Sequence, residues 1–374
     1  MYLENIGRNH VWLQSLDPNQ GPVELLGIDE VSTSSADSLV RSSSVRVAAV
    51  QIGITEDKQD KAREFKVIVR LQPSGILSLP TIQNKHFTGE ILIQRIEAEA
   101  AVVQLGKSDF EAGMTYEYDE KEEYGNKITN RIQRATLIGK VRVETGESLF
   151  DKHEGLKDDL SDVCIALSLC YRQIVDYYEI EYIDCGDKPK PWETLHRRRW
   201  NSTKVKTAGD ELINTRALVG AGLQRLFASI QTSPRSEDLR RAIKFIAASY
   251  TTNIETAFFM TFSAMETVVL CCLDKSELHR HLARRVQRAS KKYCAKTDDL
   301  WLNMSFEEGM KRAAKIRNGL FHAADSSFEE SISKDLIRVR TFAERLLLKL
   351  LSWPDDDIWN WCDQDLKWTN QGDG

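Results

Sequence analysis

The chain has 374 residues, of which 41% are hydrophobic and 29% charged, a length and composition typical of two or three globular domains. Its formal net charge of −5 argues against a protein whose whole surface binds nucleic acid, so any such surface has to be local. The seven cysteines are odd in number and show no CxxC spacing, which favours reduced thiols over disulfides or a zinc site. The first residues do not resemble a secretory leader. No stretch approaches the roughly 18 consecutive apolar residues of a membrane span, so we expect a cytoplasmic protein without a membrane partner.

The first 150 residues are predicted to be rich in β-strands. Runs of β-branched residues with partial alternation occur at residues 45–54, 65–71 and 89–105. A further strand is predicted from Leu137. The acidic stretch YEYDEKEEYGNK, which begins at Tyr116, is predicted to be an exposed loop.

Residues 151–210 are predicted to be a connecting α/β segment. A short helix is expected over residues 159–173, and VDYYEIEYID, which begins at Val175, is typical of a strand. The following CGDKPKPW contains one glycine and two prolines, which indicates a break.

From Glu211 onward the pattern is helical. Three capping boxes predict helix starts, at Thr252–Glu255, Ser305–Glu308 and Ser327–Glu330. Apolar positions three or four apart predict buried stripes, at Leu239, Ile243, Ile246, Ile332, Leu336, Val339, Phe342, Leu346 and Leu350. The chain is therefore predicted to be an α+β multidomain protein: a β-rich domain (1–150), a connecting segment (151–210), an all-α bundle (211–353) and an acidic, Trp-rich tail (354–374).

The segment KIRNGLFHAA, residues 315–324, concentrates polar groups beside apolar ones. On a helix Asn318 and His322 lie four positions apart and share one face, and the long side chain of Arg317 can reach the same face. Leu320 and Phe321 are expected to be buried. The predicted helix also carries an apolar stripe, at Phe306, Met310, Ala313 and Ile316.

An imidazole, a guanidinium and an amide together suit the cleavage of a phosphodiester. The imidazole of His322 titrates near neutrality and can transfer a proton, and the cation of Arg317 can stabilise charge on phosphate oxygens. The amide of Asn318 can orient either group. If the nucleophile is the 2′-hydroxyl of RNA, no metal or other cofactor is required. The alternative is structural: a capping pair of Asn318 and His322, with Arg317 in a surface ion pair.

The sequence Arg317-Asn318-Gly319-Leu320-Phe321-His322 resembles the R-N-x-x-x-H signature of HEPN domains. The surrounding layout resembles the ApeA-like branch, which is associated with abortive infection. FSAMETVVL, which contains Glu266, precedes the motif, and a long apolar helix follows it. The resemblance covers about residues 211–353 and implies a helical bundle, a homodimer whose motifs meet at the interface, and metal-independent RNA cleavage that leaves a cyclic phosphate. Some members of the family are inactive and act as binding or dimerisation modules.

Three further features are candidates for supporting roles. Glu266 is expected to hydrogen-bond Arg317 or His322, with a buried cap or ion pair as the alternative. HRHLARRVQRASKKYCAK, from His279, is a basic amphipathic stretch without acids that suits contacts with RNA phosphates or a solvated face. Its candidate RNA-binding residues are Arg280, Arg284, Arg285, Arg288, Lys291 and Lys292. HRRRWNSTKVK, from His196, is a second basic cluster, suited to stacking on a base or to a linker.

These features predict a metal-independent endoribonuclease, acting as a defence effector in anti-phage abortive infection or as a toxin. RNA is the expected partner, the β-rich domain is expected to sense a trigger, and a phage-derived trigger or an antitoxin is a possible further partner. The alternative is a non-catalytic module that dimerises or binds a nucleotide or protein, with recognition in the β-rich domain.

Overall fold

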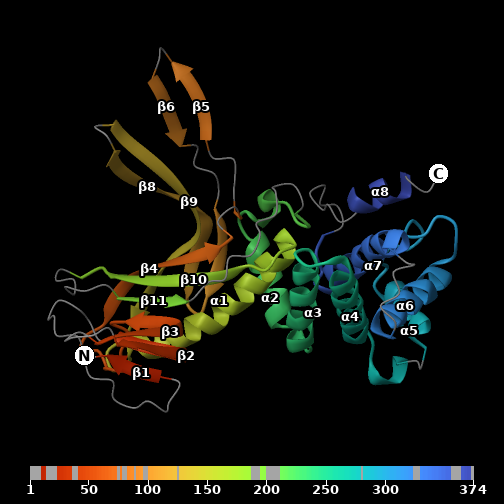
Figure 1. Ribbon diagram of the computed structural model, residues 1–374, viewed down its shortest axis with the longest axis horizontal. Helices are drawn as coiled ribbons and strands as arrows, with labels where there is room; N and C mark the ends of the chain where they lie inside the picture. The colour runs from red at the N-terminus through yellow and green to blue at the C-terminus, as the bar shows by residue number, and fades with distance from the viewer. Residues whose placement is uncertain are drawn as a thin grey trace. The chain divides into compact units, whose positions relative to one another are not determined.

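The computed structural model contains an antiparallel sheet and a set of α-helices, so the chain is mixed α and β (Figure 1). This agrees with the predicted fold class at the level of helix and sheet content. The structure describes residues 10–13, 23–35, 41–73, 76–77, 82–87, 90–95, 100–123, 126–186, 194–198, 211–278, 281–322, 329–354 and 364–371.

The chain divides into two compact units. The first, here named the sheet unit, holds residues 1–161 and 176–203, and the second, the helical unit, holds residues 162–175 and 204–374. The expected connecting segment 151–210 is therefore not a separate unit: residues 151–161 and 176–203 belong to the sheet unit, and residues 162–175 and 204–210 belong to the helical unit. The division falls inside one helix, because residues 162–175 pack with the later helices and residues 176–203 return to the sheet.

Nine described strands form one antiparallel sheet in the order β1-β2-β3-β11-β10-β4-β9-β8-β7 (Figure 1). A separate hairpin consists of β5 and β6. The strands are β1 (His10–Leu13), β2 (Val23–Ser35), β3 (Arg41–Ile52), β4 (Arg63–Gln72), β5 (Ile82–Phe87), β6 (Glu90–Arg95), β7 (Ala101–Leu105), β8 (Ser108–Glu123), β9 (Asn126–Val143), β10 (Asp176–Asp184) and β11 (Thr194–Arg198).

The prediction of an exposed acidic loop from Tyr116 was wrong. Residues 116–123 continue β8 and pair with β9, for example Glu117 with Ile132 and Lys121 with Ile128. From Tyr116 to Asp119 aromatic and acidic residues alternate with the period of a strand, and the partner strand supplies β-branched residues. The run at residues 89–105 is likewise not one strand, since β6 and β7 belong to different sheets.

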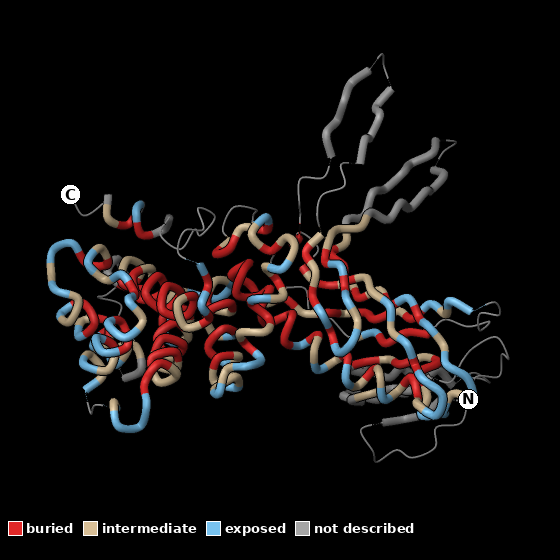
Figure 2. The backbone as a smooth tube through the Cα atoms, turned by 180° about the vertical axis from the view of Figure 1, so that it is seen from behind, coloured by how far each residue is buried: buried red, intermediate tan, exposed pale blue. Residues whose placement is uncertain are grey.

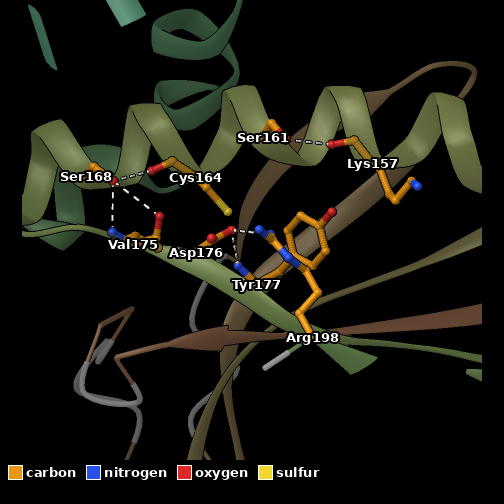
Figure 3. A network of polar contacts seen from close by, with 8 residues as sticks. All are labelled: Lys157, Ser161, Cys164, Ser168, Val175, Asp176, Tyr177 and Arg198. Atoms are coloured by element: carbon orange, nitrogen blue, oxygen red, sulfur yellow. Dashed lines mark hydrogen bonds and ion pairs between the residues drawn. The ribbon is translucent and has the colours of Figure 1, made fainter. Parts of the chain in front are cut away.

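Helix α1 (Leu149–Tyr171) has 23 residues and is longer than the predicted short helix. Its end is stabilised by Ser168, whose Oγ donates to the carbonyl of Cys164 at 2.7 Å and accepts from the backbone N–H of Val175 at 2.9 Å (Figure 3). Arg172 follows the helix with a φ of 49°, in the left-handed region where helices often end. The backbone N–H of Gln173 bonds back to the carbonyl of Ser168.

Two histidines lie buried where α1 meets the sheet within the sheet unit. His153 of α1 is 0% exposed and His196 of β11 is 3% exposed, and their ring centroids are 4.8 Å apart. The Nδ1 atom of His153 lies 2.9 Å from the hydroxyl of Tyr182 on β10. At the start of β10, Asp176 accepts a hydrogen bond of 2.9 Å from Arg198, which also lies over the ring of Tyr177 (Figure 3).

The remaining helices belong to the helical unit. They are α2 (Gly222–Gln231), α3 (Ser236–Ser249), α4 (Ile254–Cys272), α5 (Leu282–Lys292), α6 (Phe306–His322), α7 (Glu329–Leu350) and α8 (Gln364–Gln371). α4 packs against α3 and α7, and Figure 2 shows much of these helices as buried. The predicted buried stripes are confirmed at Leu239, Ile243, Ile246, Ile332, Leu336, Val339, Phe342 and Leu346, whereas Leu350 is only half-buried.

Two of the predicted capping boxes lie in the described part of the chain. Ser305 and Glu308 form one, because each side chain bonds the backbone N–H of the other residue. The first box was predicted one residue too early: Asn253 caps α4 by accepting from the N–H of Thr256 at 2.9 Å. Asparagine and threonine both suit this position, so sequence alone does not separate them. The third box, from Ser327, lies outside the described residues.

Among the described helices, α4 is long and apolar enough to cross a membrane by length and composition. This differs from the expectation that no segment approaches a span. Its composition also suits the centre of a helical unit, where Phe258, Phe262 and Val268 are fully buried.

Candidate functional site

The candidate site lies on α6, whose position in the helical unit is set by its apolar stripe. Met310, Ala313 and Ile316 are buried as predicted. Phe306 is half-buried, with its ring centroid 5.2 Å from that of Phe342 on α7. Residues 306–322 therefore form one helix that ends at His322, and the motif occupies its last turn and a half.

A buried polar cluster joins α6 to α7. The carboxylate of Asp335 on α7 is 0% exposed and accepts from Arg312 Nε at 2.8 Å, Trp301 Nε1 at 3.0 Å and Arg338 Nη1 at 3.2 Å. The Trp301 ring also lies so close to Gly309 that a Cβ there would meet it at 2.2 Å. The first turns of α6 are thus fixed by the ion pair between Arg312 and Asp335 and by the close contact of Trp301 with Gly309, which only glycine allows.

Arg317 lies against α4. Its Nη2 is 3.5 Å from Oε1 of Glu266, and its guanidinium carbon lies 4.9 Å from the ring centroid of Phe262. Both charged side chains are about one-third exposed, at 32% and 31%, so solvent reaches them. The structure therefore brings together two of the predicted site residues, Arg317 and Glu266.

The other motif residues are only partly described. Asn318 is exposed on α6. Leu320, which was expected to be buried, is half-buried. The side chains of Phe321 and His322 lie outside the description, although the backbone at both positions is helical.

Phe262 is the residue of this site that sequence analysis missed. It is 0% exposed and stacks with Phe258, so it looked like an ordinary core residue. The signal that finds it is its spacing: Phe262 and Glu266 are four apart on α4 and so lie on one face. A guanidinium can stack its flat face on an aromatic ring and direct its N–H groups at a carboxylate, so a ring and a carboxylate at this spacing can both contact it.

The basic stretch forms α5, which contacts α4 and α6. Arg284, Arg288, Lys291 and Lys292 are exposed and Arg285 is half-buried, while Arg280 lies outside the described residues. The stretch itself contains no acid, but a turn at residues 274–277 brings acidic residues against α5.

That turn supplies two acidic residues and a carbonyl group. Lys292 Nζ lies 2.7 Å from Glu277 and 3.4 Å from Asp274, and Arg288 donates to the carbonyl of Glu277 at 2.8 Å. The hydrogen bond that Lys292 donates to Glu277 raises the pKa of Lys292. Lys292 is therefore already paired with carboxylates, and Arg284, Arg288 and Lys291 are further exposed cations of α5.

The second basic cluster begins on strand β11. His196 points into the sheet unit and is buried, which leaves Arg197 exposed on β11 and paired with Glu179. Residues 199–206 of this cluster lie outside the described residues. Within the described residues, no three His, Cys, Asp or Glu side chains are grouped closely enough to hold a metal ion.

No family model matches the chain, and neither a curated protein nor a solved structure matches it. The resemblance to HEPN domains therefore stays a prediction that rests on the sequence motif and its surrounding layout.

Proposed function

We propose that the chain is a metal-independent endoribonuclease of HEPN type, acting as a cytoplasmic defence or toxin effector. The observation that supports this most directly is the placement of Arg317. Its guanidinium is held at a solvent-accessible position on α6 by Phe262 and Glu266, with exposed Asn318 next to it. His322 follows at the end of the same helix, one turn beyond Asn318.

The proposed reaction is an attack of the RNA 2′-oxygen on the adjacent phosphorus. The new P–O bond closes a 2′,3′-cyclic phosphate and the bond to the 5′-oxygen breaks. An imidazole accepts the proton of the 2′-hydroxyl, and a protonated imidazole returns a proton to the 5′-oxygen. Arg317 stabilises the charge that grows on the phosphate oxygens, and Asn318 orients the reacting groups.

A homodimer through the helical unit would supply both imidazoles. One copy of the motif provides one His322 and one Arg317, and twofold symmetry doubles each. The exposed cations Arg284, Arg288 and Lys291 on α5 would hold the RNA backbone. The sheet unit would recognise the trigger, which we propose to be of phage origin or an antitoxin.

The direct test compares RNA integrity in cells that express the wild type, His322→Ala and Arg317→Ala. General acid–base catalysis contributes roughly 10²- to 10⁴-fold, so both variants should lose RNA cleavage and toxicity. Lys315→Ala, an exposed α6 position outside the motif, is the matched control and should cleave like the wild type. Wild-type cleavage by His322→Ala would exclude the proposed reaction.

A purified preparation then tests the metal-independent step. The wild type should cleave RNA equally well with and without EDTA, and the products should carry cyclic phosphate ends. If EDTA stops cleavage and one divalent cation restores it, the proposed mechanism is wrong even if the chain is a ribonuclease.

A non-catalytic module is the second candidate, and one observation favours it. Arg317 already has a carboxylate and an aromatic ring as partners, which is the environment of a structural arginine as well. In that case the helical unit would dimerise or bind a nucleotide or protein, and recognition would lie in the sheet unit. Sedimentation would then show a dimer in His322→Ala as in the wild type, with no RNA cleavage by either.

A further inference from the structure

We infer that Phe262 is a positioning residue for Arg317: its ring and the Glu266 carboxylate form a two-sided cradle that fixes the guanidinium before substrate binds. The inference rests on the proposed function, in which Arg317 binds phosphate oxygens. It adds a residue that the motif does not contain and gives a role to a contact between α4 and α6.

The two partners restrict different motions of the guanidinium. The ring of Phe262, 4.9 Å below the guanidinium carbon, favours one orientation of the planar group. Glu266 lies beside Nη2 at 3.5 Å and so favours one rotation within that plane. Because Phe262 and Glu266 are one turn apart on the same helix, both restraints come from a single rigid element.

The environment of Arg317 leaves donors available for a ligand. An arginine carries five N–H donors, and the contact with Glu266 involves only one nitrogen. The Nε atom is buried and has no hydrogen-bond partner in the described structure, whereas the side chain as a whole is 32% exposed. The guanidinium is therefore buried at its Nε, while part of the side chain reaches solvent, which suits a phosphate that arrives from solvent.

Phe262 is itself held firmly, as a positioning residue requires. It is 0% exposed and stacks on Phe258, with ring centroids 6.2 Å apart and planes 18° from parallel. Thr261, beside it on α4, is also 0% exposed. A ring packed this way cannot follow a moving guanidinium, so it sets where the guanidinium rests.

The experiment compares the wild type with Phe262→Leu, Phe262→Tyr and Glu266→Gln. Leucine keeps most of the apolar volume without a ring, and tyrosine keeps the ring. The first readout is hydrogen exchange of the Arg317 Nε–H by NMR, with the signal assigned by its absence in Arg317→Lys. The second readout is kcat and KM for cleavage of one RNA.

We expect Phe262→Leu to speed the exchange of the Arg317 Nε–H and to lower kcat, each by roughly three- to thirtyfold, which corresponds to the usual range of a cation–π contact. KM should change less, because pre-orientation acts mainly as charge develops on the phosphate. Phe262→Tyr, which keeps the ring, should show the exchange rate of the Arg317 Nε–H and the kcat of the wild type. Glu266→Gln should have the smaller effect, about 1.5- to fivefold, because the pair is one-third exposed.

Arg240 provides the internal control. Its Nε donates to Asp162 at 2.6 Å elsewhere in the helical unit, so its exchange should not change in any variant. Faster exchange at both arginines would show general loosening and would overturn the cradle. If Phe262→Leu does not fold, Glu266→Gln decides: unchanged exchange at Arg317 would equally overturn the cradle.

The two readouts separate this inference from the proposed function. A wild type that cleaves no RNA, together with exchange that responds to Phe262→Leu, would retain the cradle and reject the ribonuclease. A wild type that cleaves RNA, together with unchanged exchange and unchanged kcat in Phe262→Leu, would reject the cradle and retain the ribonuclease.

Discussion

The sheet unit and the helical unit bury polar side chains in opposite ways. At the contact between α1 and the sheet, the sheet unit buries two imidazoles, His153 and His196, beside the hydroxyl of Tyr182. Along α7 the helical unit buries carboxylates and guanidiniums in contact with each other. At these two places the sheet unit buries neutral polar groups, whereas the helical unit buries charges that are paired with each other.

Desolvation explains the behaviour of the histidines. Burial lowers the pKa of His196 to about 4, with Lys157 and Arg198 acting in the same direction. Burial also lowers the pKa of His153 to about 2, and His196 and Lys157 add to the effect. Of the groups facing this pair, the tyrosines Tyr177 and Tyr182 supply no negative charge near neutral pH, so both imidazoles stay neutral there.

Pairing explains the buried charges of α7. Glu344 is 0% exposed and receives two hydrogen bonds from Arg172, at 3.0 and 2.6 Å, and one from the hydroxyl of Tyr250 at 2.7 Å. Arg340 lies over the ring of Tyr250 and donates to the carbonyl of Ser249. These bonds join the segment after α1 and the end of α3 to one turn of α7. We therefore expect acid to destabilise the sheet unit through its buried histidines. The helical unit should instead be destabilised by a substitution that removes one member of a buried ion pair.

The largest effect on stability is expected for Glu344→Ala. The substitution leaves the guanidinium of Arg172, which is 3% exposed, without its carboxylate in the interior. Breaking a buried pair in this way typically costs about 3–5 kcal/mol. Urea unfolding should show this loss, and Glu237→Gln, whose side chain is 88% exposed in a distant pair of 3.8 Å, should unfold like the wild type. A Glu344→Ala variant as stable as the wild type would show that α7 does not depend on its charges.

A smaller effect is expected from acid at the sheet unit. The folded pKa values of His153 and His196 lie below the ordinary value near 6.5, so their contribution to stability is complete above pH 6.5. As the pH falls below 6.5 the unfolded chain takes up protons that the folded chain does not, and stability is lost until about pH 4 for His196. The expected loss is about 2 kcal/mol for each imidazole between pH 7 and pH 5.

NMR titration checks this directly. The ring signals of His153 and His196 should not shift between pH 7 and pH 5. An inflection near pH 6.5 for either ring would mean that its nitrogen is solvated or paired, and the contrast between the two units would disappear. Carboxylates also contribute to acid unfolding, so the ring signals are a more specific measure than the unfolding curve.

Much of the fold was predictable because periodicity reports which face of an element is buried. The stripes of α3, α6 and α7 and the strands β4 and β10 follow from apolar spacing alone. The β8–β9 hairpin was missed because acidic residues suggested a loop although the alternation was that of a strand. The division inside α1 was missed because it depends on which neighbours each half contacts, and local sequence does not record that.

The candidate site was predictable only in part, both in its residues and in its contacts. The motif named Arg317 and Asn318, and the resemblance of FSAMETVVL to the layout of HEPN domains named Glu266. The role of Phe262 depends on the approach of α4 to α6, and the pairing of Lys292 depends on a turn that folds back onto α5. Both are contacts between elements, which no periodicity within one element determines.

A moderate loss of stability is expected for Leu320→Ala. Sequence alone suggested that Leu320 is a core residue whose truncation to alanine lowers the free energy of unfolding by roughly 2–5 kcal/mol. Leu320 is half-buried, so we expect about 1–2 kcal/mol, since only part of its area leaves water. Leu346→Ala is the matched control in α7, and at 0% exposed it should lose the full 2–5 kcal/mol. The loss of unfolding free energy in Leu320→Ala should be measured at high and at low protein concentration. If it equals the loss in Leu346→Ala at high concentration but is smaller on dilution, a dimer interface covers Leu320.

The smallest effect on stability is expected at the exposed cations of α5. Arg284, Arg288 and Lys291 are surface residues, so changing all three to glutamine should alter stability by only about 0.5 kcal/mol per site, in contrast to the buried guanidiniums on α7. If they contact RNA phosphates, their loss should weaken RNA binding and reduce the slope of log affinity against log salt by about one per contact. Lys292→Gln is the control, since Lys292 is already paired with Glu277 and should change the slope less. An unchanged slope in the triple variant would show that α5 is a solvated face, and a large loss of stability would show that its cations belong with the buried charges of α7.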